Sequence, residues 1–289
     1  MDPHLLRTYV TVARLASFSE AARELGYTQS AVSQHIAALE QDLGAALLTR
    51  RPVAPTPAGD RLLEHAGPLL LRLDAARAEV VRMAAAPEQG LTLAAAPAAL
   101  TPRTVRALPM AGVTLSVLSR DEIPAAVATG AADLGLVDGL AAPSDPLHLP
   151  DVAPLSAHAV AEEPVAVLLA EDHPLARRAG LRLGDLVDAR WLDAPGTALP
   201  LAQLRAANGT SGFRPALRYD GTDLRTLAAL VAAGHGLALL PKAPADEARG
   251  TVAVPLTSPR VVHRTELLHA GALRGPARTL AAQLDVTRS

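Results

Sequence analysis

The chain of 289 residues contains no cysteine, a single lysine and only six aromatic residues. Without cysteine it can form neither a disulfide bond nor a thiolate metal site, and its histidines include no HExxH or HxxxH pair. No stretch approaches the roughly 18 uninterrupted apolar residues of a membrane span. Asp2 and Arg7 interrupt the start, where a signal peptide would need an apolar run. The sequence therefore predicts a soluble, cytoplasmic protein with no membrane association, cofactor or metal.

An excess of positive charge is also lacking, because the net charge is −2. Residues 1–60 hold five arginines against six acidic residues. A protein that coats nucleic acid through bulk electrostatics would be basic. Any attraction to DNA must therefore come from the placement of charges. The length predicts two or three structural units of about 100 to 200 residues each.

Start and stop signals at the N-terminus predict three short helices. Pro3 begins the first, and Ser17 begins the second because it is spaced from Glu20 as a capping box. Gly26 ends the second helix, and Thr28 can cap a third. A short helix, a glycine turn and a further helix form a helix-turn-helix arrangement, whose second helix lies in the DNA major groove.

The third helix, "YTQSAVSQHIAALEQDLG", has two sharply different faces. At about 100° per residue, one face is apolar and consists of Val32, Ile36, Leu39 and Leu43. The opposite face carries small or polar residues: Ser30, Ser33, Gln34, Ala37 and Gln41. Gln can form a bidentate pair with adenine, and Ser can bond to bases or phosphates. A solvated face on an ordinary amphipathic helix is the alternative that this segment leaves open.

The following segment, "LLTRRPVAPTPAG", favours the DNA-binding interpretation. It combines a short β-like run with Arg50 and Arg51 and a proline-rich hairpin, as a wing that contacts the DNA backbone would require. An ordinary exposed arginine pair is the alternative.

A long helix is predicted from Thr56 and Pro57 to about Ala86. Its apolar residues alternate at spacings of four and three, as in a coiled-coil seam: Leu62, Ala66, Leu69, Leu73, Ala76, Val80 and Met83. The seam packs either on its own chain or on a partner helix. We favour a second subunit, because the preceding domain is too small to cover a helix of about 45 Å.

Beyond a linker, "AAAPEQG", strands alternate with helices. Strands are predicted at 91–96, 113–118, 132–137, 164–170, 190–194, 216–220 and 237–241, and helices from 101 and at 123–129, 183–187, 199–207 and 222–233. Such alternation predicts mostly parallel sheets with helices on their faces. Ligands of these folds bind outside the carboxyl ends of strands, usually in a cleft between two halves.

The segment "FSEAARELGYTQSAVSQHIAALEQDLGAALLTR" resembles the LysR-type transcriptional regulators. It follows that family's pattern of an Ala-Ala pair, Leu, Thr or Ser before Gln, Ala-Val-Ser, Ile, Leu-Glu, Leu-Gly and a closing Arg. Leu48 and Pro55 depart from it, since Phe and an aliphatic residue are common there. The resemblance continues into "EDHPLA" and "VAAGHGLALLP" and covers nearly the whole chain.

The resemblance implies an α/β protein in three parts. These are a winged helix-turn-helix DNA-binding domain (1–57), a linker helix for dimerisation (58–89) and an effector-binding domain (90–289) whose two α/β lobes resemble periplasmic binding proteins. It implies a homodimer or, more often, a homotetramer on promoter sites in double-stranded DNA. RNA polymerase is a further candidate partner. The ligand would be a small organic effector of unknown identity.

The resemblance also implies site residues. Gln29, Ser30, Ser33 and Gln34 would face bases or phosphates, Thr28 would cap the helix, and Arg50 and Arg51 would approach the backbone. The effector site would comprise Ala98, Ala99, Arg120, Asp138, Gly196, Thr197 and Thr222, although the hydroxyl expected at Ala98 is missing. A partly apolar carboxylate is the candidate effector, with Arg120 adding charge. The alternative is that Thr197 and Thr222 only cap helices while Arg120 is an exposed loop residue.

Two rival functions compete with this interpretation. An α/β enzyme with a regulatory N-terminal module would need catalytic residues, yet the chain contains no GxSxG turn, GxGxxG motif, P-loop or cysteine nucleophile. An architectural protein that binds DNA of any sequence would be basic, and this chain is not. The sequence therefore predicts a regulator with no catalytic residues.

Overall fold

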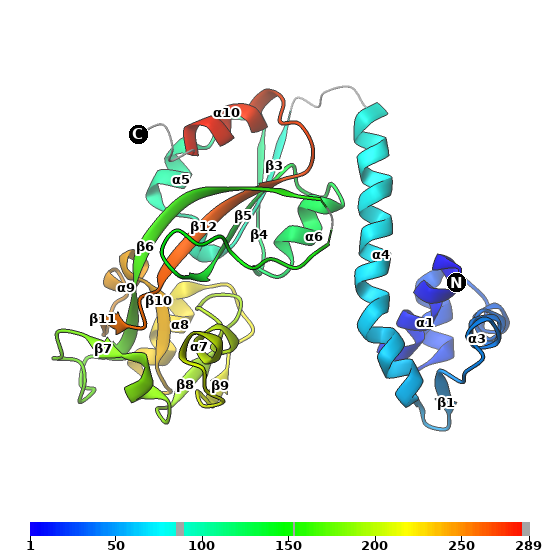
Figure 1. Cartoon of the computed structure of the whole chain (residues 1–289), viewed down its shortest axis with the longest axis horizontal. Coiled ribbons are helices and arrows are strands. Elements are labelled where there is room, and N and C mark those ends of the chain that lie inside the picture. Colours follow the sequence, from blue (N-terminus) through cyan, green and yellow to red (C-terminus); the bar gives the residue numbers. More distant parts are fainter. Residues whose placement is uncertain (85–89, 153, 285–289) are drawn as a thin grey trace. The chain divides into compact units, whose positions relative to one another are not determined.

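The computed structural model (Figure 1) describes residues 1–84, 90–152 and 154–284, and the chain divides into two compact units with a boundary after Arg77. The first unit comprises residues 1–77 with residues 151 and 152, and the second comprises the described residues of 78–150 and 154–284. The predicted end of the long helix at Ala86, and most of the linker after it, lie outside the described residues.

The first unit opens with three helices, α1 (Pro3–Leu15), α2 (Phe18–Leu25) and α3 (Gln29–Leu43). Each begins where the sequence predicts, because a side-chain oxygen caps it. Ser17 Oγ accepts from the Glu20 amide at 3.2 Å, and Thr28 Oγ1 accepts from the Ala31 amide at 3.1 Å. Gly26, with φ at 69°, ends α2 in the left-handed conformation that glycine adopts without strain.

The apolar face of α3 forms part of the core of this unit. Val32, Ile36 and Leu39 are buried. Leu43 was predicted on the same face, but it is 42% exposed because it occupies the last position of α3, beyond the core. The helical wheel therefore predicts the buried face correctly at Val32, Ile36 and Leu39 and wrongly at Leu43.

A hairpin and a long helix complete the unit. The hairpin pairs β1 (Leu48–Arg50) with β2 (Val53–Pro55), and α4 (Pro57–Ala84) follows it. A Cβ atom on Gly59 would lie 2.2 Å from the Leu47 carbonyl oxygen. Only glycine therefore lets the first turn of α4 approach the hairpin so closely.

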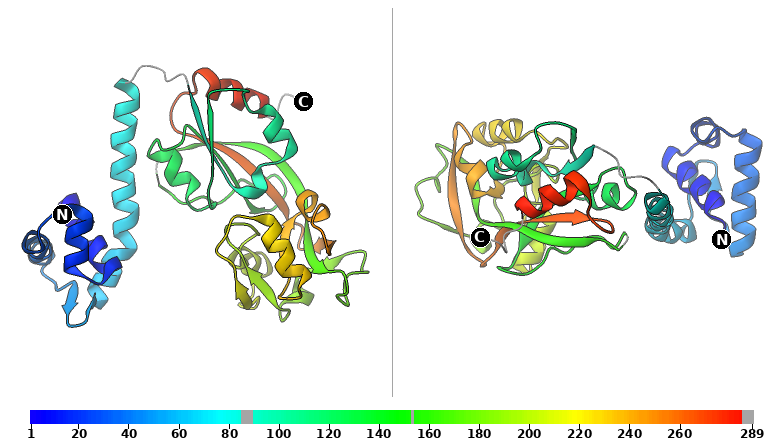
Figure 2. Two further views of the ribbon diagram at one scale, coloured as in Figure 1. Left: turned by 180° about the vertical axis from the view of Figure 1, so that it is seen from behind. Right: turned by 90° about the horizontal axis from the view of Figure 1, so that it is seen from above.

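The second unit contains two lobes. The sheet of the first lobe has the order β4 (Val113–Val117), β3 (Leu91–Ala95), β5 (Leu134–Ala141), β12 (Val262–His269), β6 (Ser156–Ala170). β3 is parallel to both of its neighbours, whereas β12 is antiparallel to β5 and β6. The chain moves outward from β3 to β4 and then back to β5. Right-handed crossovers therefore place α5 (Pro102–Ala107) and α6 (Ile123–Ala128) on opposite faces (Figures 1 and 2). α10 (Gly275–Leu284) lies beside α5.

The second lobe continues from the same long strand. The latter part of β6 pairs with β10 (Ala238–Pro241) and β11 (Thr251–Ser258), and β11 also pairs with β7 (Leu181–Arg182). β8 (Trp191–Asp193) pairs with β9 (Pro215–Arg218). The helices are α7 (Leu201–Asn208), α8 (Leu224–Ala232) and α9 (Lys242–Asp246). Trp191 anchors the core, where its ring nitrogen donates to the Leu186 carbonyl at 2.9 Å.

Several predictions about this unit are wrong. The sheets are mixed, because β12 and β6 run antiparallel to their neighbours, and the helix predicted at 183–187 is a short 3-10 turn, Leu183–Leu186. β6 begins at Ser156, eight residues before the predicted strand at 164–170. Its first half lies at the sheet edge with residues 156–159 exposed, so it lacks the apolar alternation of a buried strand.

We expect Ile36→Ala to lower the free energy of unfolding of the first unit by about 2–5 kcal/mol, because it empties a fully buried site. Leu43→Ala on the same helix should change it by less than about 0.5 kcal/mol. Urea denaturation followed by far-UV circular dichroism measures both. Equal losses would contradict the assignment of the buried face.

Candidate functional site

The polar face of α3 is presented to solvent by its first two turns. Gln29, Ser30 and Gln34 are exposed, and Ser33 is half-buried. Thr28 is exposed but its hydroxyl oxygen is used as the helix cap. The structure therefore brings all five predicted residues to one helix end, with four of them able to present polar groups to a ligand.

Contacts from neighbouring helices fix this end of α3. Ser19 Oγ on α2 donates to Gln29 Oε1 at 3.3 Å. His35 packs edge-on against Tyr27 at 5.2 Å between ring centroids, and its Nδ1 lies 3.1 Å from Thr8 Oγ1 on α1. Tyr27, 44% exposed beside the helix start, was not among the predicted residues. The polar face is therefore held rigidly relative to the rest of the unit.

The two hairpin arginines differ in their surroundings. The Arg50 guanidinium lies over the Phe18 ring at 4.9 Å and 3.5 Å from Glu40. Glu40 also accepts the Leu47 amide at 2.8 Å, so it ties the hairpin to α3. Arg51 is exposed at the hairpin turn. Arg51 is thus the more available cation, whereas Arg50 is positioned by contacts within its own unit.

The apolar seam of α4 divides into two parts. Ala66 is fully buried in the core of the first unit, so the prediction that it faces a partner helix is wrong, whereas Leu62 is half-buried against that core. Leu69, Leu73 and Val80 are 45%, 43% and 68% exposed, and Ala76 is also exposed. The first turns therefore serve the core, and the later turns present an uncovered apolar stripe.

Arg120 connects the two lobes of the second unit. It lies in the loop between β4 and α6, and its side chain is buried. Its Nη2 donates to the Ala198 carbonyl at 2.8 Å and its Nε donates to the Pro195 carbonyl at 3.3 Å. The same Nη2 is 3.6 Å from Asp138 Oδ2 on β5. The alternative of an exposed loop residue is therefore wrong.

Predicted effector residues gather around this arginine. The carbonyls that accept from Arg120 flank Gly196 and Thr197, and a Cβ atom on Gly196 would lie 3.7 Å from Thr222 Cγ2. Thr197 donates its hydroxyl to the Gly221 carbonyl at 3.0 Å. The cap of α8 is Asp223, so Thr222, which is exposed, does not cap the helix. Ala98 and Ala99 lie buried in the 3-10 turn after β3.

Two residues of this junction were missed by the sequence analysis. His263 and Thr265 are both fully buried on β12, and His263 Nε2 lies 2.8 Å from Asp138 Oδ2. His263 Nδ1 is 3.7 Å from Glu163 Oε1, an ion-pair distance too long for a hydrogen bond. A sequence pattern that could have identified them is "HRTELLH", in which His263, Thr265 and Leu267 stand at every second residue. Such spacing places side chains on one face of a strand.

The buried charges shift one another's protonation. Burial alone would lower the pKa of His263, but the hydrogen bond to Asp138 and the charges of Asp138 and Glu163 outweigh it and raise that pKa above 6.5. Burial alone would raise the pKa of Asp138, but the Arg120 charge and the His263 hydrogen bond hold it below 3.8. The junction therefore favours a protonated histidine beside an ionised aspartate.

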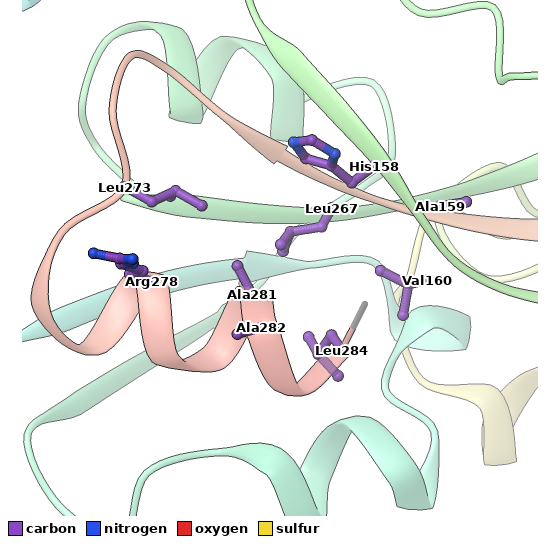
Figure 3. A pocket seen from close by; sticks show the side chains of 9 residues that line it. All are labelled: His158, Ala159, Val160, Leu267, Leu273, Arg278, Ala281, Ala282 and Leu284. Atoms are coloured by element: carbon purple, nitrogen blue, oxygen red, sulfur yellow. The ribbon is translucent and has the colours of Figure 1, made fainter. Parts of the chain in front are cut away.

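A separate pocket of about 350 Å³ opens on the first lobe between β6, β12 and α10 (Figure 3). Apolar side chains, including Leu267, Leu273 and Leu284, dominate its lining, with His158 and Arg278 as polar members. His158 Nε2 lies 3.2 Å from His269 Nε2 on the neighbouring strand. None of the predicted effector residues lines this pocket.

A winged helix-turn-helix unit, joined to a two-lobed α/β unit with polar residues buried between the lobes, defines the class of ligand-controlled DNA-binding regulators. Among the described residues, no helix is long and apolar enough to cross a membrane. Within the same residues, no cluster of three or more histidine and carboxylate side chains could hold a metal ion.

Comparison with known families agrees with this class. Residues 3–60 match the bacterial regulatory helix-turn-helix proteins of the lysR family, and residues 78–284 match the LysR substrate binding domain. The chain therefore belongs to the LysR-type transcriptional regulators, whose members bind DNA and small-molecule effectors and form oligomers.

Individual relatives match most of the chain. The small neutral protease regulatory protein of Streptomyces coelicolor is 31% identical over 80% of this chain and 70% of its own. The transcriptional regulator AlsR of Bacillus subtilis is 27% identical over 83% of this chain and 80% of its own. A mutant of Corynebacterium glutamicum OxyR has 26% identity and a TM-score of 0.51, covering 98% of this chain and 89% of its own.

The protonation of His263 gives a pH-dependent stability. Its pKa is raised on folding, so its contribution is fully present below pH 6.5 and is lost as the pH rises through the folded-state value. We expect the stability advantage of the wild type over His263→Gln to shrink across that window, by at most about 1.4 kcal/mol per pH unit.

Urea unfolding followed by the fluorescence of Trp191 measures this, because the chain has one tryptophan and it lies in the core of the second unit. His235→Gln, at an exposed histidine, is the matched control and should show no such trend. An advantage that grows with pH would refute the assignment.

Proposed function

We propose that the chain binds promoter sites in double-stranded DNA through the first two turns of α3. The observation that carries the proposal is the exposed set Gln29, Ser30 and Gln34, with Ser33 half-buried beside it, on a helix whose opposite face is locked in a core. Side chains of this size and chemistry pair with base edges in the major groove. Their rigid placement supports sequence-specific contacts over a merely solvated face.

The hairpin supplies the contacts that position the helix. Arg51, exposed at the turn, and Arg50, half-exposed beside Phe18, would bind backbone phosphates beside the groove. The net charge of −2 leaves little bulk attraction, so these local cations carry the electrostatic part. The affinity should therefore differ between DNA sequences and should not be set by the salt concentration alone.

We further propose that the chain self-associates through the exposed stripe of α4, which consists of Leu69, Leu73, Ala76 and Val80. This stripe belongs to a linker that we assign to residues 58–89, between a DNA-binding domain at 1–57 and an effector-binding domain at 90–289. An isolated apolar stripe of this spacing is stabilised when a second helix covers it. The first lobe offers another uncovered apolar surface on α5 and β4, with Val105, Leu115 and Val117 between 40% and 52% exposed. Two such surfaces on one chain support a homodimer that pairs into a homotetramer.

The second unit would bind a small organic effector at the lobe junction around Arg120, Asp138, Gly196 and Thr197, with Thr222 at its margin and Ala98 and Ala99 behind it. Arg120 touches both lobes, so a ligand that alters its contacts would change the angle between them. That change would alter subunit packing and the spacing of the DNA-binding units. In this proposal the protein is a cytoplasmic regulator and RNA polymerase is a further partner. It carries out no catalytic step and uses no metal or membrane.

The proposed DNA interface is tested by selecting bound duplexes from a random pool with the purified chain. We expect an interrupted palindrome, because paired subunits present paired helices. Ser33→Ala and Gln34→Ala should each weaken binding to the selected site by about 1–3 kcal/mol, or roughly 5- to 150-fold. Gln41→Ala, an exposed glutamine near the other end of α3, is the control and should bind as the wild type does.

Failure to enrich any sequence, together with wild-type behaviour of both variants, would show that the polar face is only solvated. Equal affinity for all duplexes with a steep dependence on salt would instead favour an architectural DNA-binding protein.

The proposed dimer seam is tested by placing charge on the stripe. Leu69→Glu combined with Leu73→Glu should shift the chain toward smaller assemblies in analytical ultracentrifugation, because two buried carboxylates would oppose pairing. Leu43→Glu is the matched control, since Leu43 is a leucine of nearly equal exposure on another helix. An unchanged sedimentation coefficient in the double variant would remove α4 from the interface.

A further inference from the structure

Four buried polar atoms at the lobe junction have no hydrogen-bond partner within the described part of the chain. They are Arg120 Nη1, Asp138 Oδ1, His263 Nδ1 and Thr265 Oγ1. The side chains are among the most enclosed polar groups of the chain, with exposures of 6%, 3%, 1% and 1%. Buried polar groups in proteins are almost always paired, so a cluster of four indicates that something outside the chain completes it.

The four groups belong to one face of one sheet and the loop above it. Thr265 lies directly opposite Asp138 in the register of β12 and β5. His263 is two residues earlier on β12, so its side chain leaves the same face. Arg120 reaches Asp138 from the loop after β4. The unpaired atoms thus comprise a cationic donor, an anionic acceptor and a hydroxyl on one face of the sheet.

The charge already present restricts that ligand. Arg120 carries a positive charge, Asp138 and Glu163 carry negative ones, and the raised pKa of His263 favours a second positive charge beside them. A ligand with a net charge would bury that charge without compensation, which is costly away from water. A ligand that brings one charge of each sign adds no net charge and can satisfy Arg120 Nη1 and Asp138 Oδ1, while His263 Nδ1 keeps Glu163 at 3.7 Å.

We propose that the effector is a small α-amino acid, bound as a zwitterion by Arg120, Asp138 and Thr265. This inference rests on the proposed effector function and narrows its ligand from a carboxylate to an amino acid. The carboxylate accepts from Arg120 Nη1, and the ammonium donates to Asp138 Oδ1 and Thr265 Oγ1. Thr265 is the specificity residue that the sequence analysis did not identify.

The test uses the full chain and a panel of proteinogenic α-amino acids, scored first by the shift in apparent Tm and then by calorimetry. Each amino acid that binds is compared with its matched carboxylic acid, which lacks the amino group, and its matched amine, which lacks the carboxylate. We expect both analogues to bind about tenfold more weakly or worse, because each leaves one buried ionic atom unpaired.

Two variants isolate the hydroxyl without changing charge. Thr265→Val keeps the shape of the side chain and removes the hydrogen bond, so it should weaken amino-acid binding by about tenfold. Thr265→Ser keeps the hydroxyl and should retain most of the affinity. A Tm equal to that of the wild type in the absence of ligand shows that each variant is folded.

The remaining outcomes separate this inference from the proposed function. Binding of a plain carboxylate or an uncharged molecule, abolished by Arg120→Lys and indifferent to Thr265→Val, would overturn the amino-acid class and leave the effector site in place. Equal affinity for an amino acid and its matched carboxylate would do the same. Absence of any binding, with normal DNA recognition, would mean that water alone satisfies the cluster and would overturn both.

Discussion

Asp138 is a carboxylate buried where solvent does not reach, and the arrangement of the second unit follows from the need to compensate it. Its partners come from distant segments: Arg120 from the loop after β4, and His263 from β12 near the end of the chain. An uncompensated buried charge costs far more than a paired one gains. The first lobe, the returning strand and the Pro195–Ala198 loop of the second lobe are therefore held to one point by a single ionic group.

The strand that carries His263 has charged groups on both faces. On the opposite face, Arg264 pairs with Glu162 and, at 2.6 Å, with Glu266. Glu162 and Glu266 in turn accept amides of the 144–147 segment, at Ser144 and Leu147. β12 therefore links the loop that follows β5 to the lobe junction. A ligand bound at the junction as proposed would be connected to that loop through β12.

The sequence predicted the DNA-binding unit well because its signals are local. A cap at Thr28 and a stop at Gly26 lie within one turn of the structure that they determine, and the helical wheel fails only at Leu43, where α3 runs past the core. The lobe junction was predicted in part: Arg120, Asp138, Gly196 and Thr197 do meet. His263 and Thr265 were missed because β12 pairs with β5 across more than a hundred residues, and no local pattern specifies that register.

The α3 face depends on local contacts and the lobe junction on contacts between distant segments, and this difference has a functional consequence. The polar groups of α3 stay exposed and can change one at a time without disturbing the core on the other face. At the lobe junction each side chain compensates another, so replacing one leaves a second buried and unpaired. If α3 and the junction act as we propose, specificity for DNA would vary by single substitutions in α3, whereas specificity for a ligand at the junction would change in compensating pairs. Thr265 would be the exception, because it is uncharged, and its replacement would alter the proposed ligand contacts without breaking the balance of charge.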